Sequence, residues 1–407
     1  MLLAVIAASG VGCETRRLTV VEVSAQMPAV AAEIDSTDEA ARSRACQKLN
    51  MQDPEVAKIA LPHLIRLLKS EKEHVPEVAA GLLSKAGPAA VPAVPALVAA
   101  MGDPRVSVRR SAAHVIGRIG PGAREAVPAL GKAMGDSQAS VREAAVGAVE
   151  GIGPGAGEAF PALLKALDDP ESSVRRQAAR SMAVFGPAAR PALPRLIQML
   201  EEEPSEGRGN PWLEHEAAAL AIGAMGPEAR EAVPLLARRC RERAREAFLS
   251  ALGRIGPGAK EAVPEIVAAM DNRDRPYLRG VALSALGDIG EAAAPAVPYI
   301  ARTLDDPKNR RTALWALTRI GPAAIPTLVG ELGNADPQRR ARGAIALAVM
   351  GPAARPALPS LEALRGDTTR GGPEFSDNSV PRNVGEWASY AIDCIGGREP
   401  RKDLLHY

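Results

Sequence analysis

The sequence predicts an all-α protein, an α-α superhelix in which about ten helical hairpins stack in one row. Two observations predict it: a glycine recurs at nearly constant spacing, and a proline follows that glycine at a fixed distance. The composition agrees, because 46% of the residues are hydrophobic but only 3% are aromatic. The core must then consist of small aliphatic side chains, which suit closely packed helices.

The recurring glycine ends one helix of each repeat. Glycine accepts the left-handed conformation found just after a helix, and the proline that usually follows it cannot continue the helix. Successive copies from Gly87 to Gly186 are 33 residues apart, and the later intervals run from 30 to 40. A degenerate tenth copy ends at Gly396. The nine clear copies are Gly87, Gly120, Gly153, Gly186, Gly226, Gly256, Gly290, Gly321 and Gly351.

The proline marks the start of the first helix of the next repeat, because proline is tolerated only in the first turn of a helix. It stands eight residues after the glycine in eight of the nine copies, as at Pro128 and Pro161.

The second helix of each repeat is amphipathic. Apolar or small residues stand one, four, five and eight residues before the glycine, as at Ile119, Ile116, Val115 and Ala112. These offsets share one face of a helix, so that face is expected to be buried.

With Val-Arg-x-x-Ala and Ile-Gly-Pro as its hallmarks, the chain resembles the short HEAT-like repeats of the type found in phycobilisome lyase subunits. Val108-Arg109 and Val141-Arg142 carry the first motif most clearly. The resemblance covers roughly residues 36–396 and implies a HEAT/armadillo-like solenoid with a concave helical surface. It favours a non-catalytic scaffold that binds a partner protein, although such repeats serve unrelated roles.

An arginine eleven residues before the glycine and an aspartate six residues before that arginine form a second pattern. The arginine lies at the edge of the apolar face, within reach of a turn aspartate in its own or an adjacent repeat. We predict a structural Asp/Arg ladder that ties the turns together, with ligand contact as the alternative. Its members are Asp103, Arg109, Asp136, Arg142, Asp169 and Arg175.

Charge argues against nucleic acid as the partner. The 50 basic and 48 acidic side chains nearly balance, and the positions opposite the core mix both signs, as at Arg110 and Glu143. Few aromatic residues are present to stack on bases.

Two enzymatic alternatives stay open. His215-Glu216 resembles one metal-binding repeat of deoxyhypusine hydroxylase, a HEAT-like di-iron enzyme, but a single pair supplies too few ligands, and a surface histidine is the simpler interpretation. A bilin-lyase-like role has support only from the repeats themselves. The four cysteines show no CxxC spacing, so the sequence predicts no catalytic residue, metal site or cofactor. Buried structural thiols are expected at Cys46, Cys240 and Cys394.

The N-terminus resembles a signal peptide. Residues 1–13 are apolar, and small residues precede Cys13 as in a bacterial lipobox, which implies lipidation and membrane anchorage. Gly10 replaces the usual leucine and no basic residue precedes the apolar run, so a frayed end of a cytoplasmic protein is the alternative to export. Residues 14–35 are expected to be a linker, and residues 397–407 a tail.

A partner-binding site is expected on the solvent side of the last second helices. Six residues before the repeat glycine, that side changes from small or polar residues to Trp315, Ile345 and Tyr390, with Trp387 beside them. Aromatic residues often anchor protein interfaces. The tail, or the insertion at residues 366–382 that contains Phe375, could instead cover this row. The other long insertion spans residues 201–212.

Overall fold

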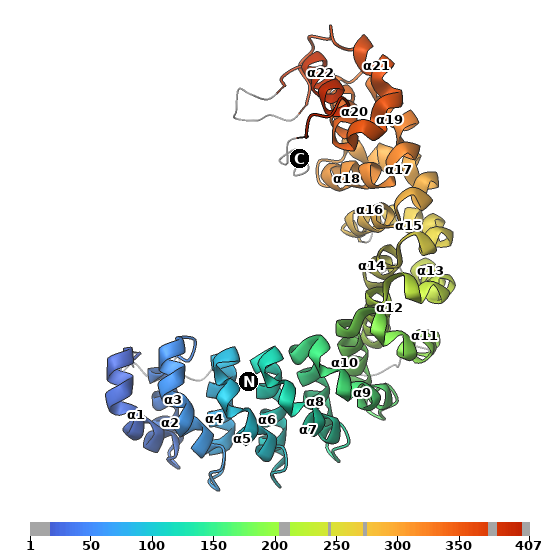
Figure 1. Ribbon diagram of the computed structural model, residues 1–407. Coiled ribbons are helices and arrows are strands. Elements are labelled where there is room, and N and C mark those ends of the chain that lie inside the picture. Colours follow the sequence, from blue (N-terminus) through green and yellow to red (C-terminus); the bar gives the residue numbers. More distant parts are fainter. Residues whose placement is uncertain (1–16, 203–211, 243–245, 272–274, 373–380, 401–407) are drawn as a thin grey trace. The chain divides into compact units, whose positions relative to one another are not determined.

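The computed structural model describes residues 17–202, 212–242, 246–271, 275–372 and 381–400. The chain divides into an N-terminal unit, Met1–Val184, and a C-terminal unit, Phe185–Tyr407. Both units consist of paired helices (Figure 1). Cys13 and the rest of the signal-like segment, residues 203–211 and 373–380 of the two insertions, with Phe375, and residues 401–407 lie outside the described residues.

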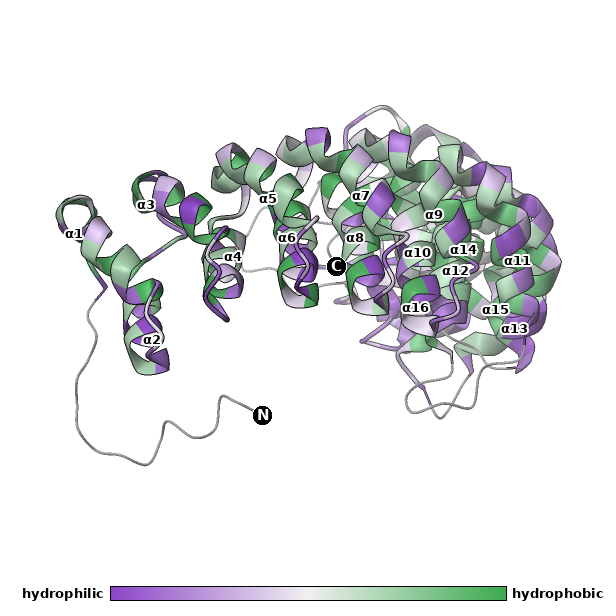
Figure 2. Cartoon of the chain, turned by 90° about the horizontal axis from the view of Figure 1, so that it is seen from below, coloured by the Kyte–Doolittle hydropathy of each residue, from purple (hydrophilic) through white to green (hydrophobic). Residues whose placement is uncertain are grey.

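The N-terminal unit stacks five hairpins. Figure 2 shows the first helices α1, α3, α5 and α7 in one row, and α2, α4, α6 and α8 in a second row. Its helices are α1 (Val20–Ile34), α2 (Glu39–Lys48), α3 (Pro54–Leu67), α4 (Val75–Ala86), α5 (Val94–Ala100), α6 (Val106–Ile119), α7 (Val127–Ala133), α8 (Ala139–Ile152), α9 (Phe160–Ala166) and α10 (Ser172–Met182), with the 3₁₀ helices η1 (Gly87–Ala93), η2 (Gly120–Ala126) and η3 (Gly153–Ala159).

The C-terminal unit repeats the same hairpin, and η4 (Ala183–Ala192) joins the two units along the chain. Its helices are α11 (Leu193–Glu201), α12 (Leu213–Ala224), α13 (Val233–Glu242), α14 (Glu246–Ile255), α15 (Val263–Met270), α16 (Leu278–Ile289), α17 (Val297–Arg302), α18 (Arg310–Ile320), α19 (Ile325–Leu332), α20 (Pro337–Met350), α21 (Leu358–Ala363) and α22 (Val384–Ile395), with η5 (Gly226–Ala232), η6 (Gly256–Ala262), η7 (Gly290–Ala296), η8 (Thr303–Asp305), η9 (Gly321–Ala324) and η10 (Gly351–Ala357).

One repeat shows why the sequence folds this way. Gly120 ends α6 with a φ of 78°, a conformation that a side chain disfavours. The 3₁₀ helix η2 follows, and α7 begins with Pro128 in its first turn. The apolar stripe of α6, which includes Ile116 and Ile119, is buried. Within the described ranges no strand forms, and a single β-bridge links Arg370 to Asn383. The predicted all-α solenoid is confirmed.

The linker expected at residues 14–35 is wrong. Residues Val20–Ile34 form α1, which begins with a capping box between Thr19 and Glu22 and packs against α3. Helix α1 has a buried apolar stripe with the helical period, which includes Val23, Met27 and Ile34. It lacks the Gly-Pro pair that marks the later repeats. The described residues therefore hold eleven hairpins rather than about ten.

Two apolar stretches of the described residues, 75–100 and 337–363, are long enough to cross a membrane. Each is folded from two α-helices joined by a 3₁₀ helix, with a positive-φ glycine at the break. Neither is one straight helix, so both belong to the solenoid.

Candidate functional site

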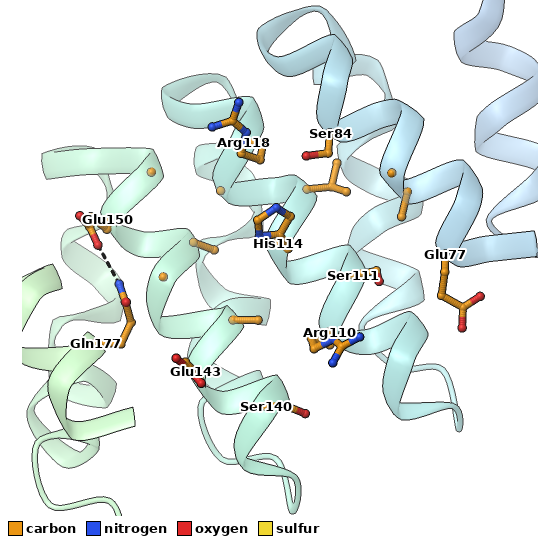
Figure 3. A pocket seen from close by; sticks show the side chains of 18 of the residues that line it. Glu77, Ser84, Arg110, Ser111, His114, Arg118, Ser140, Glu143, Glu150 and Gln177 are labelled. Carbon is orange, nitrogen blue, oxygen red and sulfur yellow. Dashed lines mark hydrogen bonds between the residues drawn. The ribbon is translucent and has the colours of Figure 1, made fainter. Parts of the chain in front are cut away.

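A groove of about 1070 Å³ lies on the second helices of the N-terminal unit. Helices α4, α6 and α8 line it side by side, and Gln177 of α10 closes one end (Figure 3). Since the first helices occupy the other row, the groove faces away from them.

The floor of the groove is made of small residues because α6 and α8 approach very closely. A Cβ atom on Gly151 would lie 2.1 Å from the backbone oxygen of Gly117, and one on Gly117 would lie 2.9 Å from Cα of Ala148. Side chains at these positions would push the helices apart. Gly81 of α4 is different, since a Cβ there meets no atom within 4 Å and would project into open space.

Charged side chains line the groove. Arg110, His114 and Arg118 follow one another along α6 in the middle of the groove, and all three are exposed. The acidic residues of α8 are engaged by α10: Glu150 accepts a 2.7 Å hydrogen bond from Nε2 of Gln177.

The predicted ladder residues lie at the turns, away from the groove. Arg109 donates to both carboxylate oxygens of Asp136 in the next repeat, with Nε to Oδ2 at 2.7 Å and Nη2 to Oδ1 at 3.0 Å. Its Nη1 also donates to the carbonyl oxygens of Asp103 and Pro104. The hydrogen bonds from Arg109 hold the pKa of Asp136 below its usual value.

The next pair of repeats has the same geometry. Arg142 donates to both oxygens of Asp169, at 2.7 and 2.8 Å. Arg175 then donates to the carbonyl oxygens of Asp169 and Pro170 in its own turn.

The first predicted member of the ladder has a different partner. The carboxylate of Asp103 accepts from Arg105, two residues away, rather than from an arginine of the preceding repeat. In that repeat Pro76 stands at the arginine position, eleven residues before Gly87, so no guanidinium is present there to reach Asp103.

The expected surface position of His215 is wrong. Its side chain lies in α12 with 2% exposure, tilted against Trp212 at 5.2 Å between ring centres. Nε2 is 2.9 Å from the backbone oxygen of Glu202. Burial lowers the pKa of His215 and so keeps its imidazole neutral. Among the described residues, no group of three or more His, Cys, Asp or Glu side chains could hold a metal.

The exposed apolar row expected on the last repeats is also wrong. Ile345 is 3% exposed, Tyr390 5% and Trp387 0%, because α20 and α22 pack against each other and the two aromatic rings meet edge to face at 5.9 Å. The alternative of a cover is supported in part, since Gly372 of the insertion lies against the Trp387 ring and the Arg398 guanidinium of the tail lies over the Tyr390 ring, 4.9 Å from its centre. Trp315 is half-buried, and its indole covers the Cα of Gly287 on α16. The residues form part of the packing between repeats.

The three cysteines that the structure describes carry no reactive thiol signature. Burial raises the pKa of Cys240 to about 12 and also raises that of Cys394, while Cys46 is half-buried rather than buried. Thiols of raised pKa are poor nucleophiles.

Sequence reasoning missed the groove as a site. It placed Arg110 and Glu143 on the solvent side but left out Lys85 and Arg118, which stand two residues before their repeat glycines. The available signal was the set of glycines at Gly81, Gly117 and nearby positions, which marks where helices or ligands approach a backbone.

The comparisons with known proteins agree with this fold. Residues 94–183 and 141–210 match the model of HEAT repeats. Importin beta is 16% identical over 83% of this chain and 52% of its own, with a TM-score of 0.54. A chain of the Kap95:Nup1 complex is 13% identical over 91% of this chain and 57% of its own, with a TM-score of 0.56.

A third structure, the complex of CpcE and CpcF of phycocyanin lyase from Nostoc sp. PCC7120, is 24% identical over 63% of this chain and 94% of that chain, with a TM-score of 0.37. This score supports no argument from its activity. The chain spans slightly more than half the length of the importin beta and Kap95:Nup1 chains. No curated protein sequence matches it.

Proposed function

We propose that this HEAT-repeat solenoid is a non-catalytic scaffold that binds a segment of a partner protein in the groove of its N-terminal unit. The observation that carries the proposal is the groove itself, about 1070 Å³ in volume, with a floor of small residues and polar walls. A concave surface of this kind admits a polypeptide chain between the side chains of α4 and α8.

The extent of the groove over three helices, α4, α6 and α8, favours a chain over a small molecule. Gly81 leaves open space above α4, and Gly117 and Gly151 expose backbone between α6 and α8. A partner segment can therefore approach the helices closely along the floor while its side chains reach the charged walls. The Kap95:Nup1 complex shows that a solenoid of similar fold occurs with a second protein.

The chemistry of the groove gives little support to catalysis. His114 is the histidine among its lining residues, and no hydrogen bond of the described residues joins it to a carboxylate or to a serine. General base catalysis requires such a pairing with a nucleophile. The histidine is instead positioned as one of several charged or polar side chains on α6.

Affinity capture with two matched variants tests the proposal. The full-length chain is used as bait in a lysate of its source organism, and the captured proteins are identified and their affinities measured. Gly81→Leu fills the groove from α4. Gly131→Leu is the control, because Gly131 lies on the first helix α7 and a Cβ there also meets no atom within 4 Å.

Both substitutions replace glycine inside a helix and should raise helix stability by similar amounts, about 0.5–1 kcal/mol. We expect a partner to bind the wild type and Gly131→Leu equally and Gly81→Leu at least about tenfold more weakly. Partners that bind all three proteins equally would overturn the groove as the binding site.

A further inference from the structure

We infer that the occupant of the groove is an acidic peptide segment in extended conformation, with carboxylates at alternate positions facing α6. This inference rests on the proposed function and names the class of partner that the site fits. It is based on which charged side chains of the groove form ion pairs or hydrogen bonds within the protein, and on the spacing of the basic side chains that form none among the described residues.

The basic side chains of the groove have no acidic partners. Lys85 on α4 and Arg110, His114 and Arg118 on α6 are exposed, and none of the hydrogen bonds or ion pairs of the described residues reaches them. Each is therefore available to a ligand at little cost in broken contacts.

The acidic side chains of the groove are engaged. Glu150 lies 3.8 Å from Arg180 and accepts from Gln177, and Glu143 lies 3.9 Å from Arg176, all on α10. Oε1 of Glu77 accepts a hydrogen bond from Ser107 on the neighbouring α6, while its buried Oε2 has no hydrogen-bond partner among the described residues. The lining itself carries three Lys or Arg and three Glu side chains, and Arg176 and Arg180 beside the groove add positive charge next to two of those Glu side chains.

The spacing along α6 sets the conformation of the ligand. Arg110, His114 and Arg118 are each four residues apart, so they repeat about every 6 Å along the helix axis. Residues on one side of an extended strand repeat about every 6.6–6.8 Å. A strand that lies along α6 would thus bring three alternate side chains opposite these three groups in turn.

Nucleic acid fits the same charges less well. No aromatic side chain lines the groove, so bases would find no stacking surface. Glu77, Glu143 and Glu150 flank α6 on both sides, so the cationic groups form one short row of three along α6 rather than a continuous track for phosphates. A peptide places its carboxylates at α6 and leaves its uncharged residues beside those glutamates.

Fluorescence anisotropy at low ionic strength tests the inference on the full-length chain. The probe is a labelled peptide in which Glu and Ser alternate. Three competitors are measured with it: a peptide of the same composition with its Glu residues consecutive, a peptide with Gln in place of Glu, and oligothymidine. Arg110→Glu/Arg118→Glu reverses the charge of the groove. Arg124→Glu is the control, since Arg124 is exposed on η2 outside the groove and also has no ion pair among the described residues.

We expect saturable binding of the alternating peptide to the wild type and to Arg124→Glu, weakened at least about tenfold by the double reversal and by added salt. The consecutive-Glu and Gln peptides should bind more weakly. The inference is overturned if the alternating peptide does not bind, if it binds the double variant as well as the wild type, or if oligothymidine displaces it at lower concentration.

These outcomes separate the two proposals. If Gly81→Leu prevents capture of a partner but the alternating peptide fails to bind, the groove is a protein-binding site for a segment of other chemistry. If capture is unaffected by Gly81→Leu, the proposed function itself fails.

Discussion

Replacing Arg109 with methionine tests how strongly the Asp/Arg pairs hold neighbouring repeats together. Methionine keeps most of the aliphatic stem but removes the guanidinium, which bonds both oxygens of Asp136 and two carbonyl oxygens of its own turn. The side chains of Arg109 and Asp136 are only 14% and 13% exposed. The variant leaves the Asp136 carboxylate with the backbone N–H of Gln138 as its remaining donor among the described contacts.

The expected loss of stability from Arg109→Met lies between the values for an exposed and for a buried ion pair. An exposed ion pair contributes about 0.2–1 kcal/mol, and breaking a buried one costs about 3–5 kcal/mol. The low exposure and the bidentate geometry place Arg109→Met near 2 kcal/mol, with ~1 kcal/mol on either side. Arg110→Met is the matched control, because Arg110 is the next residue, is exposed and has no ion pair among the described contacts. We expect its effect to stay within about 0.5 kcal/mol.

Urea unfolding followed by far-UV circular dichroism gives the free energies, and hydrogen exchange of α6 and α8 gives the location of the loss. The second measurement is needed because repeat proteins can unfold in parts rather than in one step. Equal free energies for Arg109→Met and Arg110→Met, or faster exchange spread evenly over the chain, would refute the idea that this pair couples adjacent repeats.

Three further predictions concern His215, Gly151 and Trp315. Because burial lowers the pKa of His215, the unfolded chain binds this proton at a higher pH than the folded chain. Stability should therefore be full above about pH 6.5 and fall as the pH drops below it, a dependence that His215→Gln should reduce in pH-dependent urea titrations. Gly151→Ala should cost about 3 kcal/mol in the same assay, because its methyl group would meet the Gly117 oxygen; wild-type stability would show that α6 and α8 separate easily. Trp315→Ala should lower the free energy of unfolding by about 2 kcal/mol because it uncovers Gly287. An unchanged melting temperature would instead indicate that Trp315 is a surface residue, as expected from the sequence.

The recurring glycine and proline of the repeat made the helix boundaries predictable from the sequence. Gly120 and Pro128 mark where α6 ends and where α7 begins, and both act through local backbone preferences that need no knowledge of the tertiary structure. Helix α1 was missed for the complementary reason. It has an apolar stripe and a capping box, but it lacks the glycine and proline of the repeat pattern.

The side-chain environments were less predictable, because they depend on how far one helix stands from the next. Tyr390 and Ile345 occupy positions that are exposed in other repeats, as at His114, yet the close packing of α20 and α22 buries them. His215 stands eleven residues before Gly226, at the position of the ladder arginines, and its Nε2 lies 2.9 Å from the backbone oxygen of Glu202. The groove was missed for a related reason, since the close contact of α6 and α8 at Gly117 and Gly151 belongs to no repeat motif.

The two edges of the N-terminal unit differ in how they should respond to bending. At one edge, ion pairs such as Arg109 to Asp136 join consecutive turns by directional bonds with short reach. At the other edge, η1, η2 and η3 meet through buried alanines such as Ala123 and Ala156, and no ion pair joins them among the described residues. Apolar contacts tolerate sliding better than bidentate bonds do. Under load, this unit should therefore hinge about its Asp/Arg edge and open first along its 3₁₀ edge, so that the groove changes width without breaking the Arg109–Asp136 and Arg142–Asp169 pairs.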